Sequence, residues 1–578
     1  MQGQPDSRRA APQRDAGRFA RRSVFASAPP WAVAVAAGTG LLVLAPLASL
    51  LATALAPSGD VARQLVADVL PSALLETALL LGGVALVAGA VGTGAAWLVS
   101  AHDFPLRRLL AWLLPLPLAV PTYITAYVYV DLLDAAGPVQ SALRGLMGWR
   151  LRGEYWFPEV RSLIGCVLVM SFVLYPYVYI TARAMFLTQS AAMLEVARTL
   201  GASRWELFRN VAVPLARPAL AVGLSLALLE ALNDIGAAEY LGVRTLTVSI
   251  FTTWLNRGSL PAAAQIACAM LAVVAALILL ERRGRQNRRY AGSARRARVA
   301  QPVRLAPLPG ILAAAACALP VLLGFLVPAA FLANEVRARG LVVQLDLTFL
   351  RHLATSLTLA AGATAAALIL AVVVVTTSRF ARHALTDSLK AVAGLGYAVP
   401  GTVLAIGLFG PLVAVDGLLN SVWRILTGER LGLVVMGSAA AIVVAYVVRF
   451  LPIATGSLSA GFERISATVD DAARTLGAQP RELVLRIQIP LLRPALASAA
   501  LLVFVDCLKE LPATLLLRPL NTETLATLVY GHASRGAFED GSLAALVIIL
   551  AGLWPVMRLT QSAEARRKPR PSPLPALP

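Results

Sequence analysis

Charged residues are scarce in this chain, and lysine is almost absent. Only 14% of the 578 residues are charged, whereas an ordinary soluble domain has about 25% charged residues. The chain has three lysines, and none of them follows a glycine-rich loop. The phosphate-binding pattern G-x-x-x-x-G-K-[ST] does not occur, so the chain cannot hold ATP phosphates in the usual way. The composition excludes an ordinary soluble domain, and the missing pattern excludes this type of ATPase site.

Cysteine and histidine are also rare, with four residues of each kind. The cysteines are scattered through apolar segments without a C-x-x-C pair, which favours small buried side chains over metal ligands. The histidines do not cluster, and no Ser/His/Asp or Cys/His arrangement indicates covalent catalysis. We therefore expect no metal site and no cofactor in this chain, and we expect no enzymatic reaction on it.

Long apolar runs dominate the sequence instead, since 58% of the residues are hydrophobic. A run of roughly twenty apolar residues can cross a bilayer. The runs must be helices, because lipid offers the backbone no hydrogen-bond partner and the runs lack the alternation of membrane strands. About twelve spans are expected, at 31–56, 74–100, 109–133, 160–182, 217–240, 262–281, 308–333, 353–377, 389–414, 432–455, 493–517 and 541–560. The fold class expected is an all-α integral membrane protein.

The formal net charge of +20 is mainly a topology signal. If the N-terminus is cytoplasmic, the cytoplasmic segments hold 35 Lys and Arg residues and the outer loops hold 15. Basic residues concentrate in cytoplasmic loops, so we expect both termini on the cytoplasmic side. The dense basic run between Arg282 and Arg304 is interpreted as a linker that fixes this topology and contacts lipid headgroups, not as a nucleic-acid site.

An internal duplication is the strongest pattern in the chain. The string "ARTLGA" occurs at 197–202 and again at 473–478, an offset of 276 residues. Of the 26 positions from 195 to 220, 14 are identical at that offset. An even number of spans separates the copies, so the two six-helix halves are parallel rather than inverted. Each copy falls in the cytoplasmic loop between the fourth and fifth spans of its half.

Each repeated loop is expected to form a helix–turn–helix at the cytoplasmic surface. Gly201 and Gly477 end the first helix, since glycine adopts left-handed backbone freely. Ser203 and Glu206 form a capping box for the second helix, and Pro214 and its copy Pro490 interrupt the chain before it re-enters the membrane. Such a loop either docks on another protein or packs on the chain itself, and the duplication favours docking.

The repeated loop resembles the E-A-A signature of ABC importer permeases, in which E-A-A, three residues, Gly, nine residues and I-x-L-P follow one another. The first copy has E-V-A, G and V-A-V-P at this spacing, and the second has D-A-A, G and I-Q-I-P. In that family the loop is the coupling helix that sits in a groove of the ATPase subunit. The resemblance assigns this role to Glu195, Ala197, Gly201, Ala202 and Pro214, and to Asp471, Ala473, Gly477, Ala478 and Pro490.

Further segments are similar to the fused two-domain permeases of ferric-iron importers, which are type I ABC importers. These segments are "LAVPTYITAYVY", "YAVPGTVLAIG", "KELPATLLLRP" and "TLATLVYGHASRG", and the similarity covers most of the chain from about residue 70. The resemblance implies a multi-pass permease of the bacterial inner membrane. It also implies two copies of a separate ATPase, which bind the ATP, and a periplasmic substrate-binding protein.

Two alternatives remain open at this point. Thiamine and putrescine permeases are close relatives of the ferric-iron type. A secondary transporter of the major-facilitator class also has twelve spans in two parallel halves. However, its second loop is Gly- and Arg-rich, unlike "SAHDFPLRRLL" here, and the E-A-A spacing has no role there.

The resemblance and the spans together divide the chain into seven segments. A span precedes each permease core and is expected to be accessory to it. The segments are a basic cytoplasmic N-terminus (1–30), an accessory span with an outer loop (31–71), the first permease domain (72–281), a basic cytoplasmic linker (282–307), a second accessory span with an outer loop (308–352), the second permease domain (353–560) and a disordered cytoplasmic tail (561–578).

Four acidic residues lie within predicted spans at duplicated positions. The 276-residue offset aligns Glu230 with Asp506 and Asp234 with Glu510, so each half has two acids on one predicted helix face. A charge at mid-membrane costs about 3 kcal/mol, so these acids should face protein or water. They either line the outer part of a path for a cationic substrate or form structural ion pairs, for which Arg449 and Lys509 are at hand.

Overall fold

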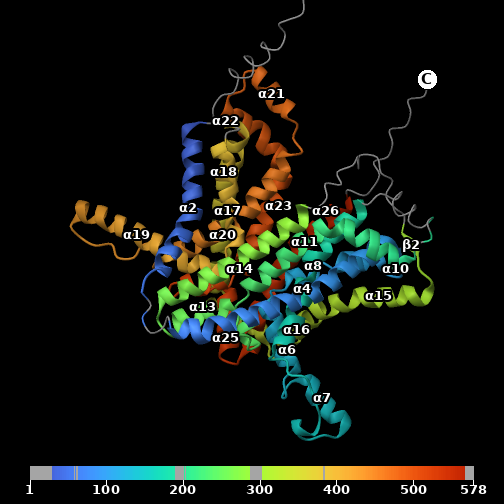
Figure 1. The fold of residues 1–578 in the computed structure, drawn as a ribbon. Coiled ribbons are helices and arrows are strands. Elements are labelled where there is room, and N and C mark those ends of the chain that lie inside the picture. Colours follow the sequence, from blue (N-terminus) through green and yellow to red (C-terminus); the bar gives the residue numbers. More distant parts are fainter. Residues whose placement is uncertain are drawn as a thin grey trace, which may run out of the picture.

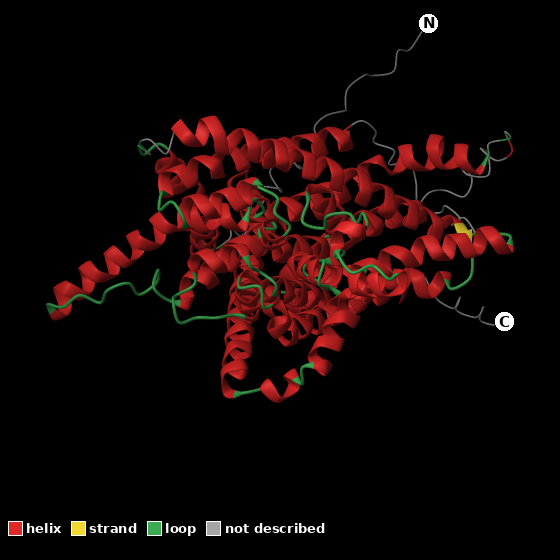
Figure 2. Ribbon diagram, turned by 90° about the horizontal axis from the view of Figure 1, so that it is seen from below, coloured by secondary structure: helices red, strands yellow, loops and turns green. Residues whose placement is uncertain are grey.

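The computed structural model describes residues 29–57, 59, 63–188, 199, 201, 203–286, 302–381 and 384–565. Eleven helices in this part of the chain are long and apolar enough to cross a membrane. Two further helical stretches, Arg107–Ala119 and Thr122–Met147, meet at 94° and would form a twelfth span together. Helix accounts for nearly all of the ribbon (Figure 2). The prediction of an all-α membrane protein with about twelve spans is confirmed.

The first half of the chain supplies the helices up to α14. They are α2 (Pro30–Ala54), α4 (Leu70–Ala101), α5 (Arg107–Leu113), α6 (Thr122–Leu133), α7 (Pro138–Met147), α8 (Leu163–Thr188), α10 (Arg204–Glu206), α11 (Val213–Asn233), α12 (Gly236–Tyr240), α13 (Leu246–Leu255) and α14 (Leu260–Gln286). Strand β1 (His102–Asp103) follows α4.

The second half supplies the rest. Its helices are α15 (Pro307–Val321), α16 (Val327–Ala338), α17 (Leu347–Ala381), α18 (Ala384–Ala393), α19 (Gly401–Thr427), α20 (Ala439–Phe462), α21 (Ala467–Thr475), α22 (Pro480–Glu482), α23 (Ile489–Leu508), α24 (Pro512–Leu517), α25 (Leu525–Ser534) and α26 (Ser542–Ala565). Strand β2 (Val303–Arg304) pairs in parallel with β1, which ties the start of α15 to the end of α4.

Two of the four π-helical turns in the described residues lie at duplicated positions, one in each half. These turns, Leu207–Ala212 and Leu483–Gln488, lead into α11 and α23. Pro214 and Pro490 follow as the second residue of each helix. A proline lacks an N–H, and its ring crowds the carbonyl four residues earlier, so a wider turn before it relieves the clash. The sequence duplication is therefore reproduced in backbone detail.

The ends of the two halves point in different directions (Figure 1). Helices α21 and α22 lie at the top of this view and α10 lies at the right, whereas α7 and the tip of α19 project at the bottom and the left. The repeated loops therefore lie toward the upper right of this view, and α7 and the tip of α19 lie on the opposite side, toward the lower left.

The span that precedes each half packs on the other half. Helix α2 contacts α17, α18 and α19, while α15 and α16 contact α4, α5 and α6, and also α26. Glycines permit the closest contacts: a Cβ on Gly407 of α19 would lie 2.4 Å from the carbonyl oxygen of Pro46 in α2. A Cβ on Gly324 would lie 2.1 Å from the carbonyl oxygen of Phe172 in α8. The two halves are consequently interlocked.

Four predicted spans are interrupted in the structure, and the bend of 94° before α6 breaks one of them, 109–133. The predicted spans 217–240 and 493–517 are broken where α11 and α23 end, and the short helices α12 and α24 follow. The predicted span 389–414 is broken between α18 and α19. A Cβ on Gly396 in this break would lie 1.9 Å from the carbonyl oxygen of Val448, so the chain there packs against α20 too closely for a side chain. Each break contains at most two charged residues, so the mean hydropathy of the run stays high and does not mark the break.

The two predicted terminal segments lie mostly outside the described residues. For the N-terminus only residues 29 and 30 are described. Helix α26 includes 561–565 of the predicted tail, and 566–578 lie outside the described residues. Of the predicted linker, α14 includes 282–286, β2 includes 303–304, and 287–301 lie outside the described residues.

Candidate functional site

The four membrane acids meet in one cavity between the halves. Glu230, Asp234, Asp506 and Glu510 all line a cavity of about 80 Å³, which we call the central chamber. The cations Arg449 and Lys509 line it as well, and α6, α8, α11, α20 and α23 supply half of its lining residues. Four carboxylates against two cations leave a formal excess of negative charge when all are ionised. The structure thus brings together residues that are up to 280 positions apart in the sequence.

The prediction that the two acids of each half share one helix face is wrong, because Asp234 and Glu510 do not lie on the helices of Glu230 and Asp506. Each lies just beyond the end of its helix and caps the next one. Asp234 accepts hydrogen bonds from the backbone N–H of Ala237 at 2.8 Å and from the hydroxyl of Thr122. Glu510 accepts from the N–H groups of Ala513 and Thr514 at 2.9 and 3.1 Å. Carboxylates satisfy the unpaired N–H groups at helix starts, so these two acids stabilise the breaks in the spans.

Arg449 forms a buried ion pair with Glu510. The distance from Arg449 Nη1 to Glu510 Oε1 is 3.3 Å, and the side chains are 9% and 1% exposed. Gly401, at the start of α19, leaves room for the pair, because a Cβ there would lie 2.1 Å from Arg449 Nη1. A buried charge without a partner is costly, so Arg449 and Glu510 must remain together. This pair is a fixed part of the chamber wall.

Glu230 and Asp506 are held more loosely. The hydroxyl of Tyr397 donates to Glu230 Oε1 at 2.6 Å. Lys509 Nζ lies 2.8 Å from Asp506 Oδ1, and these two side chains are 26% and 21% exposed. Neither acid caps a helix, so both are available to face the contents of the chamber.

A larger cavity of about 550 Å³ adjoins the chamber and shares Leu118, Tyr177, Asp506 and Lys509 with it. We call it the inner cavity, because it lies toward the repeated loops. Thr181 and Ile453 line it, and both come later along α8 and α20, which lead to the loops, than the chamber residues of the same helices. In this conformation the open volume is therefore on the loop side of the acids.

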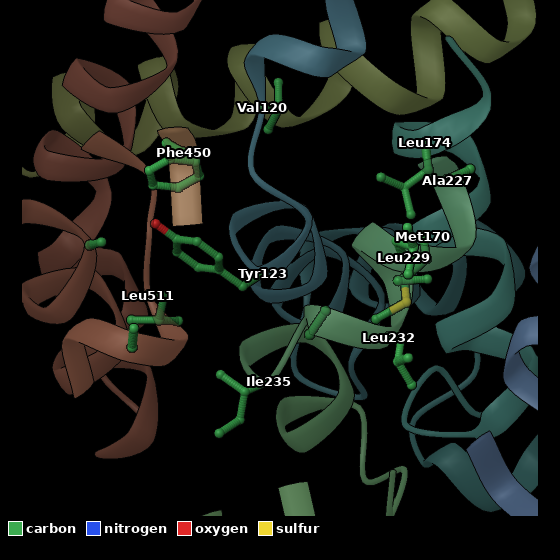
Figure 3. Packing of buried hydrophobic residues seen from close by; sticks show 14 of the residues in the cluster. Val120, Tyr123, Met170, Leu174, Ala227, Leu229, Leu232, Ile235, Phe450 and Leu511 are labelled. Atoms are coloured by element: carbon green, nitrogen blue, oxygen red, sulfur yellow. The ribbon is translucent and has the colours of Figure 1, made fainter. Parts of the chain in front are cut away.

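An aromatic layer lies on the opposite side of the chamber. Tyr123 lines the chamber, and Tyr127 follows one turn later on α6, which leads toward α7. The ring of Tyr127 packs on Tyr240 and on Phe538 of the second half at centroid distances of 4.5 and 5.2 Å. Figure 3 shows Tyr123 directed from the first half toward Phe450 of the second. Tyr123, Tyr127 and Phe538 are buried and Tyr240 is partly buried, so these rings lie packed between the chamber and the side of the molecule that carries α7.

The second repeated loop is anchored on the chain itself. Asp470, buried in α21, accepts from Arg379 Nε at 2.7 Å and from Gln488 Nε2 at 3.0 Å. Ala473 is buried in a cluster with Phe380 and Leu483. Sequence reasoning missed the Arg379–Asp470 pair, for which the only signal is a second acid directly before the motif.

Other residues of this loop face outward. Asp471 and Gly477 are exposed, and so is Leu476, at 88% of its surface. Ala478 packs partly against the buried cluster, and Pro490 lies in the first turn of α23. The exposed tip is therefore formed mainly by the residues around the glycine turn, whereas Ala473 is buried and Ala478 partly buried.

Less of the first repeated loop is described, because Glu195, Ala197 and Ala202 lie outside the described residues. Gly201 has φ +84° and Gly477 has φ +82°, so both predicted left-handed turns are confirmed. The predicted capping box is also present: Ser203 N donates to Glu206 Oε2 at 2.8 Å, and Glu206 N donates to Ser203 Oγ at 3.2 Å. The bonds from Ser203 lower the pKa of the Glu206 carboxyl.

The sequence matches the family described as "Binding-protein-dependent transport system inner membrane component" over residues 88–285 and 379–568. These ranges include more than half of the chain, and the chain belongs to this family. It is the permease subunit of an ABC importer, a multi-pass membrane component without an ATPase domain that works with ATPase and binding-protein partners. The family membership excludes the major-facilitator alternative.

Individual relatives transport different substrates. The chain is 23% identical over 503 residues to "Fe(3+)-transport system permease protein FbpB 2" of Haemophilus influenzae, covering 85% of this chain and 90% of that protein. It is 35% identical over 157 residues to the sulfate transport system permease protein CysW of Escherichia coli, covering 27% of this chain and 51% of CysW. It is 28% identical over 204 residues to the molybdenum transport system permease protein ModB of Escherichia coli, covering 34% of this chain and 86% of ModB.

Proposed function

We propose that this permease imports ferric iron across the bacterial inner membrane. A periplasmic binding protein would deliver the iron, and two copies of a separate ATPase would supply the energy. A relative that is similar over both halves is a ferric-iron permease, whereas the sulfate and molybdenum permeases are similar over about a third of the chain. Similarity over both halves supports iron more than similarity within one half does.

The excess of carboxylates in the central chamber is the observation that carries this proposal. An oxyanion would meet four carboxylates there and only two cations, one of them paired with Glu510. Like charges repel strongly in a partly desolvated site, and a cation is attracted. Thiamine and putrescine are also cations and remain alternatives.

The proposed path runs from the aromatic layer through the central chamber into the inner cavity. Glu230, Asp234, Asp506 and Glu510 would line its narrow part, with Asp234 and Glu510 also shaping the helix breaks. Closure of the ATPases would move the two repeated loops, and the rigid helices α8, α11, α20 and α23 would carry this motion to the chamber. The chamber would then open on the aromatic side and close on the loop side.

The repeated loops are the proposed ATPase contacts, and this assignment sets the topology. It applies to all ten motif residues from Glu195 to Pro214 and from Asp471 to Pro490. Both loops and both termini would be cytoplasmic, and α7 and the tip of α19 would face the periplasm. We propose permease domains at 72–281 and 353–560, which the family matches at 88–285 and 379–568 support.

Competition in a reconstituted transporter tests the substrate. The complete complex in proteoliposomes, with its binding protein and ATP, is expected to accumulate radioactive ferric iron. An excess of thiamine, putrescine, sulfate or molybdate should leave this uptake unchanged. Uptake of thiamine or putrescine in place of iron would contradict the iron assignment and leave the importer class intact.

A further inference from the structure

Lys509 is placed where the central chamber meets the inner cavity, and it lines both. Its ammonium group forms one ion pair, with Asp506, one turn earlier. Its side chain is 26% exposed, whereas that of Arg449 is 9% exposed. Arg449 is therefore buried in the chamber wall, whereas Lys509 has a flexible side chain that faces the two cavities.

The acids around Lys509 come from both halves. Asp506 on α23 and Glu230 on α11 occupy equivalent positions of the duplication, and both interact electrostatically with the ammonium group. The position equivalent to Lys509 is Asn233, whose amide oxygen accepts a hydrogen bond from Gly401 N at 3.2 Å. The first half therefore supplies an acid but no cation, and one ammonium group serves both acids.

The same chamber contains a buried polar group without a partner. Tyr123 is 4% exposed, and its hydroxyl has no hydrogen-bond partner among the residues that the structure describes. The side chain lines the chamber and extends across the interface toward Phe450 (Figure 3). A buried hydroxyl without a protein partner costs free energy, so its position in the chamber favours a polar or charged ligand there.

We propose that Lys509 is a tethered counter-cation that occupies the substrate's place between Glu230 and Asp506 and moves away when a substrate cation enters. This inference rests on the proposed function and deepens it, because it assigns a residue that determines which cations can enter. Without Lys509, the vacant chamber would hold two carboxylates without a counter-charge in the middle of the membrane, which is unfavourable.

The tether makes the chamber selective for multivalent cations. A group tethered by a short flexible chain has an effective local concentration of about millimolar or higher. A free monovalent ion has the same charge as the ammonium group, so its attraction to the carboxylates is no stronger. It therefore cannot overcome the high effective concentration of the tethered ammonium group. A divalent or trivalent ion interacts more strongly with the same carboxylates because the Coulomb energy grows with charge. Multivalent ions therefore displace Lys509 where sodium and potassium do not.

Terbium(III) is a suitable probe because it is a trivalent ion that prefers oxygen ligands and its luminescence is sensitised by nearby tyrosines. The full-length permease in nanodiscs would be titrated with terbium, in sodium chloride and without it. In Lys509→Gln, the terbium affinity is expected to rise about tenfold, since the competing charge is removed. In this variant sodium should compete with terbium, whereas in the parent protein sodium should have no effect on terbium binding. Glu230→Gln and Asp506→Asn should each weaken terbium binding.

Two further variants keep the test independent of folding. Lys509→Arg retains the charge and should keep the parental affinity, while Lys390→Gln on α18, away from both cavities, should also leave it unchanged. A gain in affinity is not produced by a misfolded protein. The inference is overturned if Lys509→Gln binds terbium no more tightly than the parent, or if Lys509→Arg binds as tightly as Lys509→Gln. Normal iron transport by the Glu230 and Asp506 variants would instead overturn the proposed path itself.

Discussion

The two halves of the permease share a framework but differ in the charges they bring to its centre. Acids occupy equivalent positions in both halves, as do the π turns and the glycine turns. The cations do not: Val173 and Asn233 stand in the first half where Arg449 and Lys509 stand in the second. The comparison teaches that a duplicated fold can enclose an asymmetric chamber, in which one half supplies all the counter-charge.

The largest effect is expected from removing the cation that only the second half has in its wall. Arg449→Leu leaves Glu510 buried without its partner, which should destabilise the protein by about 3–5 kcal/mol. Val173→Leu at the equivalent position adds one methylene group and should cost less than about 3 kcal/mol. Thermal unfolding of the two purified variants compares them. Equal unfolding temperatures would contradict the view that the ion pair is a structural element of the second half alone.

The hydroxyl partners of the capping acids provide a closer comparison. Thr514 donates to Glu510 Oε2 at 2.7 Å and also bonds to the hydroxyl of Tyr446, whereas Thr122 donates to Asp234. Thr514→Val should destabilise by about 1.5–3 kcal/mol, the range for hydrogen bonds to charged groups. Thr122→Val should have a smaller effect, because Thr122 is only partly buried. Thermal unfolding measures both, and a larger effect of Thr122→Val would reverse the ranking of the two helix breaks.

The glycine turns of the repeated loops should respond alike. Gly201→Ala and Gly477→Ala each place a side chain at positive φ without a steric contact, so each should cost about 1 kcal/mol of backbone strain. Each should reduce the amount of ATPase that co-purifies with the permease. Gly428→Ala is the matched control, since Gly428 has φ +81° at the end of α19, far from both loops. A loss of ATPase with Gly428→Ala, or none with the loop variants, would argue against the loops as ATPase contacts.

Local features of the structure could be predicted from the sequence, whereas contacts between distant segments could not. The glycine turns and the capping box at Ser203 depend on a few adjacent residues, and the structure contains them as predicted. The bond between Tyr397 and Glu230 joins residues 167 positions apart, and nothing in their local sequence indicates it. The packing of α2 on the second half is missed for the same reason, because hydropathy gives the length of a span but not its neighbour.

The breaks after α11 and α23 are an intermediate case. The sequence shows the four acids as charged residues within apolar runs. Their equivalent positions in the two halves indicate that they lie near one another in the fold. Their role as caps was not visible, because Asp234 and Glu510 appeared to lie on the same helices as Glu230 and Asp506. Only the structure shows that each helix stops before the second acid.

The most direct test of the central claim is ferric-iron transport by a permease whose two loosely held acids are neutral. The double variant Glu230→Gln/Asp506→Asn would be assembled with its ATPase and binding protein in proteoliposomes, and iron uptake and ATP hydrolysis would be measured together. A chamber that attracts the substrate cation predicts that uptake falls at least about tenfold, corresponding to about 1.4 kcal/mol, while ATP hydrolysis continues. Uptake at the parental rate would contradict the account.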